Sequence, residues 1–322
     1  MTPNRRQVFA GSAAIAAAMA LPAGAQQAAA PATPPANPGF YRFRLGGLAV
    51  TQVHDGINRR PVEGFVRNVP LPEVQAALAE RMQPADTLTI PFTLTFVETP
   101  TGLVVFDAGT GEGQMSPTSG RMGANMRAAG LDPAQVRAVI VSHFHGDHIT
   151  GLTTAANERA FPNAEVIVPA AEWAWWSDEG NASRTPEGQR GTFANTARRF
   201  APWRERMRQV ADGAEAWPGI RAIAAPGHTP GHTCYHVADG NQQLIYLADI
   251  TNRPEVMMPN PHWQIVFDMD GDAAAASRRR MLDRAASDRA RVTGYHLPFP
   301  AQGMVAREGQ GFRFVPGDWT SL

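Results

Sequence analysis

The stretch "VSHFHGDHITG", residues 141–151, places three histidines and one aspartate within six positions. It continues the apolar run "RAVIV", which predicts a β-strand that ends where the polar residues begin. In α/β proteins a strand that runs into a polar loop is a common place for a site, because the strand fixes the backbone and the loop presents side chains. The stretch therefore predicts a functional loop in an α/β protein.

The spacing of these residues is suited to metal binding. In an extended segment His143 and His145 project to the same side, so both can reach one metal ion. Asp147 and His148 follow the turn that Gly146 permits and point differently, which predicts a second ion beside the first. Two cations about 3.5–4 Å apart need anionic ligands between or beside them. Asp147 supplies one, and a second must come from elsewhere.

Other β-type runs lead to the remaining candidates. His228 lies in "APGHTPGH", Asp249 ends the run "LIYLAD", and His296 precedes a proline-rich turn in "GYHLPFP". With the first stretch they supply enough imidazoles and carboxylates for two ions of four to five ligands each, once a bridging carboxylate and a bridging water are counted. His232, four residues after His228, is an alternative ligand. Asp107, at the end of "LVVFDAG", is a candidate to orient a ligand histidine or a plain strand-end turn.

The segment "HFHGDH" matches the H-x-H-x-D-H signature of the metallo-β-lactamase superfamily, and the later candidates follow in the order of its dinuclear hydrolases. The resemblance covers about residues 40–314. It implies a four-layer αβ/βα metallo-β-lactamase sandwich. It also implies a ligand set for two metal ions, in which Asp249 bridges a first group (His143, His145 and His228) and a second group (Asp147, His148 and His296).

Within the superfamily the chain most resembles methyl parathion hydrolases and the related lactonases and arylesterases, through "HWQIVFDMD" and "GYHLPFP". The resemblance implies a metal-bridging hydroxide that attacks lactones, aryl esters or organophosphate triesters such as methyl parathion, with Asp147 and Asp249 as catalytic carboxylates. Zn²⁺ is the expected metal, while Mn²⁺, Co²⁺ and Fe²⁺ accept the same donors. It also places Trp175 and Phe193, from "AEWAWW" and the loop after it, at the substrate. The alternative is that Trp173 and Trp176, which share a face at helical spacing, fill the core, whereas Trp175 points elsewhere, toward the surface.

Three other functions compete with this one. The first is a glyoxalase II-like thioester hydrolase, although the chain has no lysine to help hold glutathione. The second is a non-catalytic metal-binding protein, in which a ligand such as His232 closes the open position. The third is a redox enzyme on the same fold, which would carry iron.

Composition excludes several other classes. The chain has 29 basic and 29 acidic residues and no net charge, which argues against binding nucleic acid. All the basic residues are arginine, so no Schiff-base or P-loop lysine exists. The expected partner is a small neutral ester, lactone or phosphotriester, and the sequence leaves the oligomeric state open, a homodimer included.

The first residues predict a targeting segment. Residues 1–25 resemble a twin-arginine signal peptide: Arg5 and Arg6 precede an alanine-rich run that ends at Ala23-Gly24-Ala25. The run is shorter than the ~20 residues of a membrane-spanning helix, so no stable membrane insertion is expected. Residues 26–39, rich in alanine and proline, are expected to form a linker. Residues 40–322 are expected to form the hydrolase domain. We therefore expect export to the periplasm.

Overall fold

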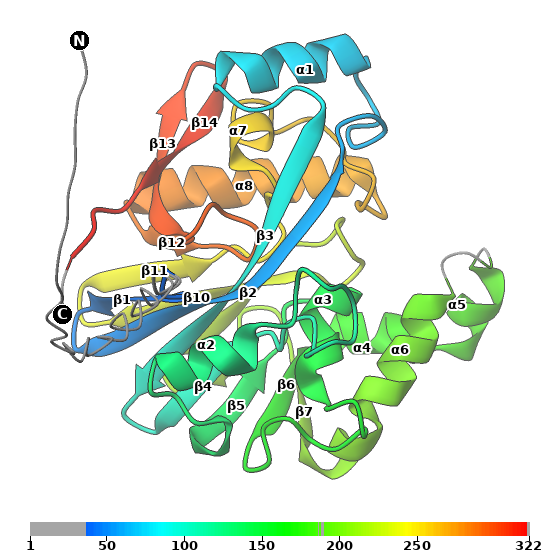
Figure 1. The fold of residues 1–322 in the computed structure, drawn as a ribbon, viewed down its shortest axis with the longest axis vertical. Helices are drawn as coiled ribbons and strands as arrows, with labels where there is room; N and C mark the ends of the chain where they lie inside the picture. Colours follow the sequence, from blue (N-terminus) through cyan, green and yellow to red (C-terminus); the bar gives the residue numbers. More distant parts are fainter. Residues whose placement is uncertain (1–36, 186, 188–189, 321–322) are drawn as a thin grey trace, which may run out of the picture. The chain divides into compact units, whose positions relative to one another are not determined.

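Two sheets form the centre of the computed structural model, which describes residues 37–185, 187 and 190–320 (Figure 1). The predicted signal peptide and most of the predicted linker lie outside these residues, so both stay predictions. The first sheet has seven strands in chain order: β1 (Phe40–Leu45), β2 (Leu48–Pro61), β3 (Thr87–Thr99), β4 (Gly102–Phe106), β5 (Val136–Ile140), β6 (Glu165–Pro169) and β7 (Met207–Val210). β1 to β4 pair antiparallel, and β4 to β7 pair parallel.

The second sheet also has seven strands, in the reverse of chain order from one edge to the other. They are β14 (Gly311–Pro316), β13 (Gln302–Glu308), β12 (Arg291–Thr293), β11 (Gln242–Tyr246), β10 (Thr233–Asp239), β9 (Ile220–Ala224) and β8 (Glu215–Trp217). Only β11 and β12 pair parallel, and they are joined through a long helix, as a parallel crossover requires.

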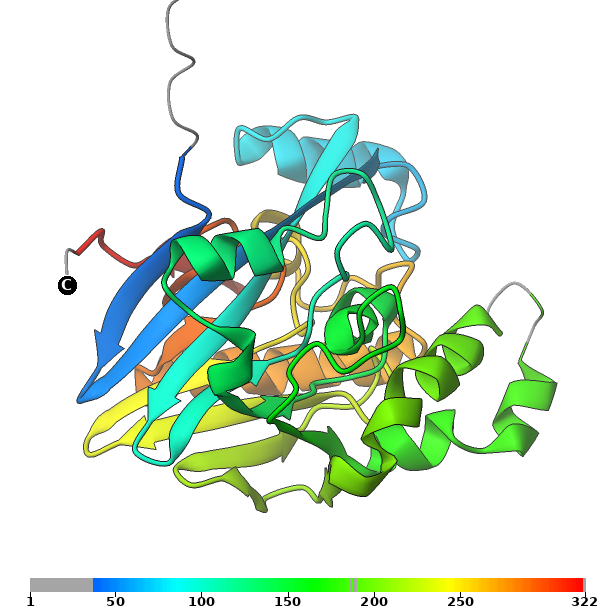
Figure 2. The same cartoon turned by 60° about the horizontal axis from the view of Figure 1, so that its bottom comes forward.

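The helices are α1 (Leu71–Glu80), α2 (Met122–Ala128), α3 (Gly146–Ile149), α4 (Ala170–Trp176), α5 (Glu179–Arg184), α6 (Gly191–Phe200), α7 (Pro254–Met257) and α8 (Gly271–Asp288). In both views α5 and α6 project from the rest of the fold (Figures 1 and 2). Among the described residues, no helix is both long enough and apolar enough to cross a membrane.

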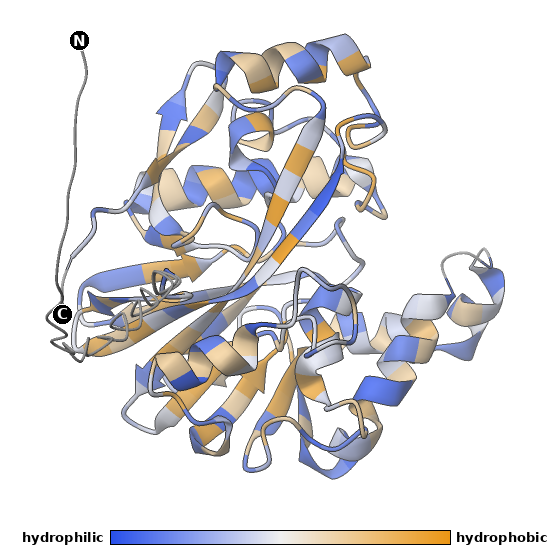
Figure 3. Ribbon diagram, in the orientation of Figure 1, coloured by the Kyte–Doolittle hydropathy of each residue, from blue (hydrophilic) through white to orange (hydrophobic). Residues whose placement is uncertain are grey.

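Three apolar cores separate four layers. The side chains of Val104 and Phe106 lie between the two sheets, whereas their neighbour Val105 faces the helices on the outer side of the first sheet. This alternation follows from the two-residue period of a strand, and it explains why β4 is apolar at consecutive positions. In Figure 3 the strands β5 and β6 are accordingly mostly orange. The third core lies between the second sheet and α8, where Leu247 packs with Met281.

The order of layers is therefore helices, sheet, sheet, helix. It confirms the predicted four-layer αβ/βα sandwich. Sheets that are apolar on both faces cannot meet water on either side, so each needs a second sheet on one face and helices on the other.

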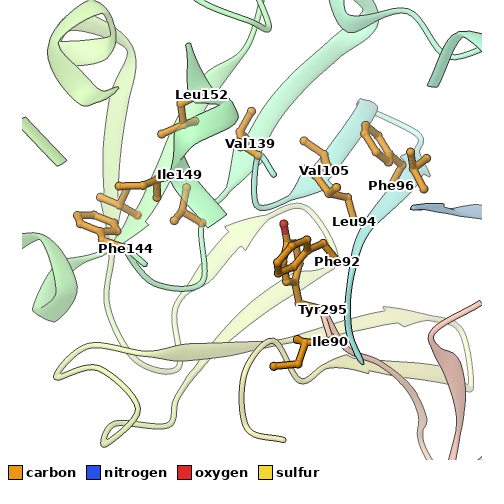
Figure 4. Close-up of a cluster of buried hydrophobic side chains, with 14 of the residues drawn as sticks. Ile90, Phe92, Leu94, Phe96, Val105, Val139, Phe144, Ile149, Leu152 and Tyr295 are labelled. Atoms are coloured by element: carbon orange, nitrogen blue, oxygen red, sulfur yellow. The ribbon is translucent and has the colours of Figure 1, made fainter. Parts of the chain in front are cut away.

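Alternate residues of β3 point into the core beneath the helices. Ile90, Phe92, Leu94 and Phe96 form this row, and Tyr295 lies beside Phe92 with ring centroids 5.9 Å apart (Figure 4). This contact brings β3 against the segment that follows β12. One end of the row thus reaches the place where the candidate ligands gather.

Candidate metal centre

The predicted metal ligands lie beyond the ends of β5, β9, β11 and β12, so both sheets supply them. They are His143, His145, Asp147, His148, His228, Asp249 and His296. The chain is extended at His145 and turns into α3 at Gly146. The extended and helical parts therefore direct their side chains to two separate groups, as the sequence predicted.

Three imidazoles form the first group. Nδ1 of His145 lies 3.1 Å from Nε2 of His143 and 3.0 Å from Nε2 of His228. On the outer side, Nδ1 of His143 contacts the Ser142 hydroxyl at 3.0 Å, and Nδ1 of His228 contacts Oδ1 of Asp268 at 2.9 Å. With Nδ1 of each ring engaged on the outer side, Nε2 of His143 and of His228 faces inward, as in metal-ligating histidines.

Asp147, His148 and His296 form the second group. Oδ2 of Asp147 lies 3.6 Å from Nε2 of His148 and 3.5 Å from Nε2 of His296. The outer nitrogens are again engaged: Nδ1 of His148 with Asp107 and Nδ1 of His296 with the Pro91 carbonyl, both at 2.8 Å. This arrangement again turns both Nε2 atoms toward the shared centre.

Asp249 lies between the two groups. Its Oδ2 is 3.3 Å from Nε2 of His228 and 3.0 Å from Nε2 of His296, so one oxygen approaches a ligand of each group. Its Oδ1 is 3.2 Å from Nε2 of His148. A carboxylate shared by two cations must lie in this position.

Two buried atoms here, Nε2 of His148 and Oδ1 of Asp249, lie 3.2 Å apart, yet neither forms a hydrogen bond of good geometry with the other or with any other described residue. Leaving such atoms unpaired costs about 1–3 kcal/mol each. Bound cations would satisfy both, and imidazole with carboxylate is a donor set that divalent transition metals accept. The residues present therefore fit two adjacent divalent metal ions.

The local charges agree with this fit. Burial opposes ionisation of Asp249, but His296 and His148 hold the pKa of its carboxyl well below its usual range. Burial likewise lowers the pKa of His148, yet Asp249 and Asp147 raise that pKa well above its usual value. Burial, and then His148, holds the pKa of His143 far down, so that imidazole is neutral. The carboxylates therefore attract positive charge, which a metal ion supplies in place of a proton.

Asp107 supports both groups. Its Oδ2 lies 2.8 Å from Nδ1 of His148 and accepts from the Tyr246 hydroxyl at 2.6 Å, while its Oδ1 accepts from the Ser142 backbone N–H at 2.7 Å. Asp107 has a φ of 62°, in the left-handed region that strains residues other than glycine. The hydrogen bond to His148 is the contact that the sequence predicted for Asp107.

A second carboxylate, Asp268, orients His228. Its other oxygen lies 3.3 Å from the guanidinium of Arg278, which is buried in α8. The same guanidinium donates to the carbonyls of Ile250, next to Asp249, and of Trp263, each at 2.7 Å. Arg278 thus connects the loop of the shared carboxylate to the partner of a ligand histidine. Asp268 lies in the segment "HWQIVFDMD", where nothing in the local spacing indicates that it meets His228.

Glu172 of α4 is fully buried and joins the two loops that carry the first group. Its Oε1 accepts from the Phe144 backbone N–H at 2.9 Å and from the Trp176 indole at 2.7 Å. Its Oε2 accepts from the Thr229 hydroxyl at 2.9 Å and the Gly231 backbone N–H at 2.7 Å. Burial raises the pKa of Glu172 although these hydrogen bonds act against it. The sequence feature that indicates this role is a single glutamate within the apolar segment "AEWAWW". A carboxylate buried there needs hydrogen-bond partners.

His232, the alternative ligand, belongs to neither group. Its Nδ1 contacts the Ala225 carbonyl at 3.2 Å, and its Nε2 accepts from the Asp249 backbone N–H at 3.2 Å. Burial, and then the charge of His228, lowers the pKa of His232 to about 3, so the ring is neutral. It holds the backbone of the shared carboxylate in place.

A cavity of about 270 Å³ opens above the centre. Its polar lining includes Asp147, Asp249 and His296, and its apolar lining is Ile90, Phe92, Met115 and Phe267. Among the described residues no arginine lines it. A mostly apolar cavity over convergent polar groups is the usual form of a small-molecule site.

The structure does not bring Trp175 to this cavity. Trp175 is half-buried against the core, and the described cavities near the centre do not include it. Phe193 packs on Trp176 with ring centroids 4.7 Å apart and lines a neighbouring cavity that shares His145 and Phe267 with the first. Trp175 therefore packs beside the core, away from the described cavities at the centre.

The family model described as metallo-beta-lactamase superfamily matches residues 93–296, a range that includes every predicted ligand. Solved structures share the fold. AidC, a dizinc quorum-quenching lactonase in complex with a product, is 24% identical with a TM-score of 0.83, over 88% of this chain and 99% of its own.

Two further structures resemble the chain. The hydrolase AbOPH of the beta lactamase superfamily is 24% identical with a TM-score of 0.84, over 89% of this chain and 100% of its own. A probable metal-dependent hydrolase from Staphylococcus aureus is 20% identical with a TM-score of 0.67, over 79% of this chain and 91% of its own. At these identities the likeness establishes the fold alone.

Proposed function

The chain belongs to the metallo-β-lactamase superfamily and is a metal-dependent hydrolase, and from this premise we propose that it hydrolyses neutral, apolar esters with two divalent metal ions. On this proposal its substrates are lactones, aryl esters and organophosphate triesters such as methyl parathion. In this proposal its activity is similar to that of the methyl parathion hydrolases and the related lactonases and arylesterases. The proposed metal is zinc, the metal named for AidC.

One observation carries the proposal: Asp249 is shared by two donor groups in a cavity that also has apolar residues on its lining. Ile90, Phe92 and Phe267 offer no charge to a substrate, which favours a neutral one. A glutathione thioester is anionic, and the described lining holds no arginine to receive it. The apolar cavity therefore weighs against the glyoxalase II-like alternative.

The bound ions would lower the pKa of a water toward ~7 and polarise the carbonyl or phosphoryl oxygen of the substrate. The side chain of Asp147 lines the cavity and is 19% exposed, so it is placed to accept a proton from water and pass it to the departing alcohol. The side chain of Asp249 is only 4% exposed, and four histidines surround it. Its part is to keep the two donor groups at a fixed separation.

Reconstitution tests the proposal. The protein is stripped with a chelator, reloaded separately with Zn²⁺, Mn²⁺ or Co²⁺, and assayed on an alkyl γ-lactone, an aryl acetate and a dialkyl aryl phosphate. We expect two ions per chain and hydrolysis of at least one class that depends on the metal. Full metal loading without hydrolysis of any of the three would contradict the proposal.

We also propose that the protein is exported to the periplasm through the twin-arginine pathway, on the strength of Arg5 and Arg6. The double variant Arg5→Lys with Arg6→Lys should stay in the cytoplasm of an expressing cell, as cell fractionation would measure. Arg279→Lys with Arg280→Lys makes the same exchange at exposed positions of α8 and should be exported normally. Equal export of both double variants would contradict the proposal.

A further inference from the structure

We propose that Asn252 contacts the substrate and that its side-chain amide donates a hydrogen bond to the carbonyl oxygen of the ester or lactone. This inference rests on the proposed function and adds a residue to it. Asn252 lies three positions after Asp249, in the turn that leads from β11 into α7. It is 1% exposed and lines the same cavity as Asp147, Asp249 and His296.

The amide of Asn252 has unused hydrogen-bonding capacity. Its Oδ1 is buried without a partner, and no hydrogen bond among the described residues involves its side-chain nitrogen. Burying an amide without hydrogen-bond partners is unfavourable. The amide therefore has both an acceptor and a donor that no described residue uses, and its place on the cavity lining leaves a bound molecule as the available partner of the donor.

The chemistry of the lining assigns the amide the role of donor. Asp147 and Asp249 can only accept hydrogen bonds when ionised, and the ring nitrogens beside them face the centre. Among the described lining residues the side-chain amides belong to Asn58, which is exposed, and Asn252. An ester carbonyl oxygen needs a hydrogen-bond donor. Among the described lining residues, Asn252 has the buried amide that can supply an uncharged donor.

The backbone around Asn252 is held in place. Its N–H points at Sδ of Met257, 3.4 Å away, within the same turn. The next side chain, Arg253, pairs with Glu255 at 3.1 Å, donates to Gln83 at 3.2 Å, and donates to the Thr89 carbonyl of β3. A donor fixed before the substrate arrives stabilises developing negative charge without reorganisation.

The test compares two variants with wild type, each loaded with zinc, on an alkyl γ-lactone and an aryl acetate. Asn252→Leu has a similar volume but no donor, and Asn252→Asp replaces the NH₂ group with a carboxylate oxygen. We expect both to bind two ions and to lose about 100-fold in kcat, with little change in KM. Elemental analysis gives the metal content, and circular dichroism confirms the fold.

Asn260→Leu is the matched control, because its amide donates to the Val256 carbonyl at 3.1 Å and does not line the cavity. It should keep the kcat of wild type. The inference is overturned if either Asn252 variant keeps a kcat within about twofold of wild type, or if both lose metal. If wild type itself hydrolyses neither substrate nor a phosphotriester, the proposed function fails and this inference falls with it.

Discussion

Asp249 is the residue on which both donor groups depend. Its Oδ2 approaches His228 of the first group and His296 of the second, and its Oδ1 approaches His148. Two cations this close repel each other, and a shared carboxylate offsets that repulsion. Without it the imidazoles of both groups would surround a space with too little negative charge for two ions.

Asp249→Ala should therefore bind at least one ion fewer per chain than wild type and lose most hydrolytic activity. Elemental analysis of the purified protein measures the metal content. Asp288→Ala removes an exposed carboxylate at the end of α8 and should keep both ions. A protein that still holds two ions without Asp249 would remove this residue from the ligand set.

Glu172 is a second single residue on which the centre depends, although it is not a predicted ligand. In Glu172→Gln the amide NH₂ replaces one acceptor oxygen, so two of the four donors around it lose their partner. We expect unfolding in urea to need about 2 kcal/mol less free energy, and a chelator to remove zinc faster because the loops of the first group loosen. Glu179→Gln, exposed on α5, should change neither. Unchanged stability and unchanged chelation of Glu172→Gln would show that the four contacts do not hold the loops.

At the scale of elements, α4 and α8 hold the centre although neither supplies a ligand. α4 carries Glu172 against both loops of the first group, and α8 carries Arg278 against the loop after β11. Asp270 caps α8 by accepting from the Ala273 N–H, and Arg289 ends it in a left-handed conformation with φ 48°. The helix is thus fixed at both ends, which keeps Arg278 in register with the carbonyls that it contacts.

Arg278→Leu should destabilise the protein by about 3–5 kcal/mol, because it leaves the carboxylate of Asp268 buried without its cation. It also leaves the Ile250 and Trp263 carbonyls unpaired. Urea denaturation of the metal-loaded protein measures the loss. Arg279→Leu changes the neighbouring exposed position of α8 and should cost little. If both variants lost similar amounts of unfolding free energy, the buried contacts of Arg278 would add no stability beyond the effect of changing an arginine in this helix.

At the scale of the whole molecule, the centre lies where the two sheets meet. His143, His145, Asp147 and His148 follow a strand of the first sheet, whereas the other ligands follow strands of the second. Bound ions would therefore connect the two halves of the sandwich. The apolar core between the sheets, with Phe106 and Tyr246 stacked at 4.7 Å, sets how closely these halves approach.

Removing the metal should lower the thermal midpoint of unfolding. Ions that bind only the folded protein stabilise it by RT ln(1 + [L]/Kd), about 2.7 kcal/mol at a concentration 100 times Kd. Calorimetry with and without a chelator measures the shift, and Asp249→Ala should show a smaller shift because it binds fewer ions. Identical midpoints with and without chelator would mean that the ions do not connect the sheets.

The amino-acid sequence by itself determined the structural features that depend only on residues close together along the chain. The spacing in residues 141–151 determined which imidazoles share a group, because backbone geometry alone directs residues two apart to one side. The apolar run at 138–141 ends in the functional loop as predicted, because strand patterning is local.

Only the tertiary structure decided which distant side chains meet. It placed Ile90, Phe92, Phe267 and Asn252 around the cavity and left Trp175 half-buried away from it. It also supplied the partners of Glu172 and Arg278, which lie in separate loops. Such contacts depend on how two sheets and their helices pack, and no spacing along the chain encodes the distance between residues that meet only across that packing.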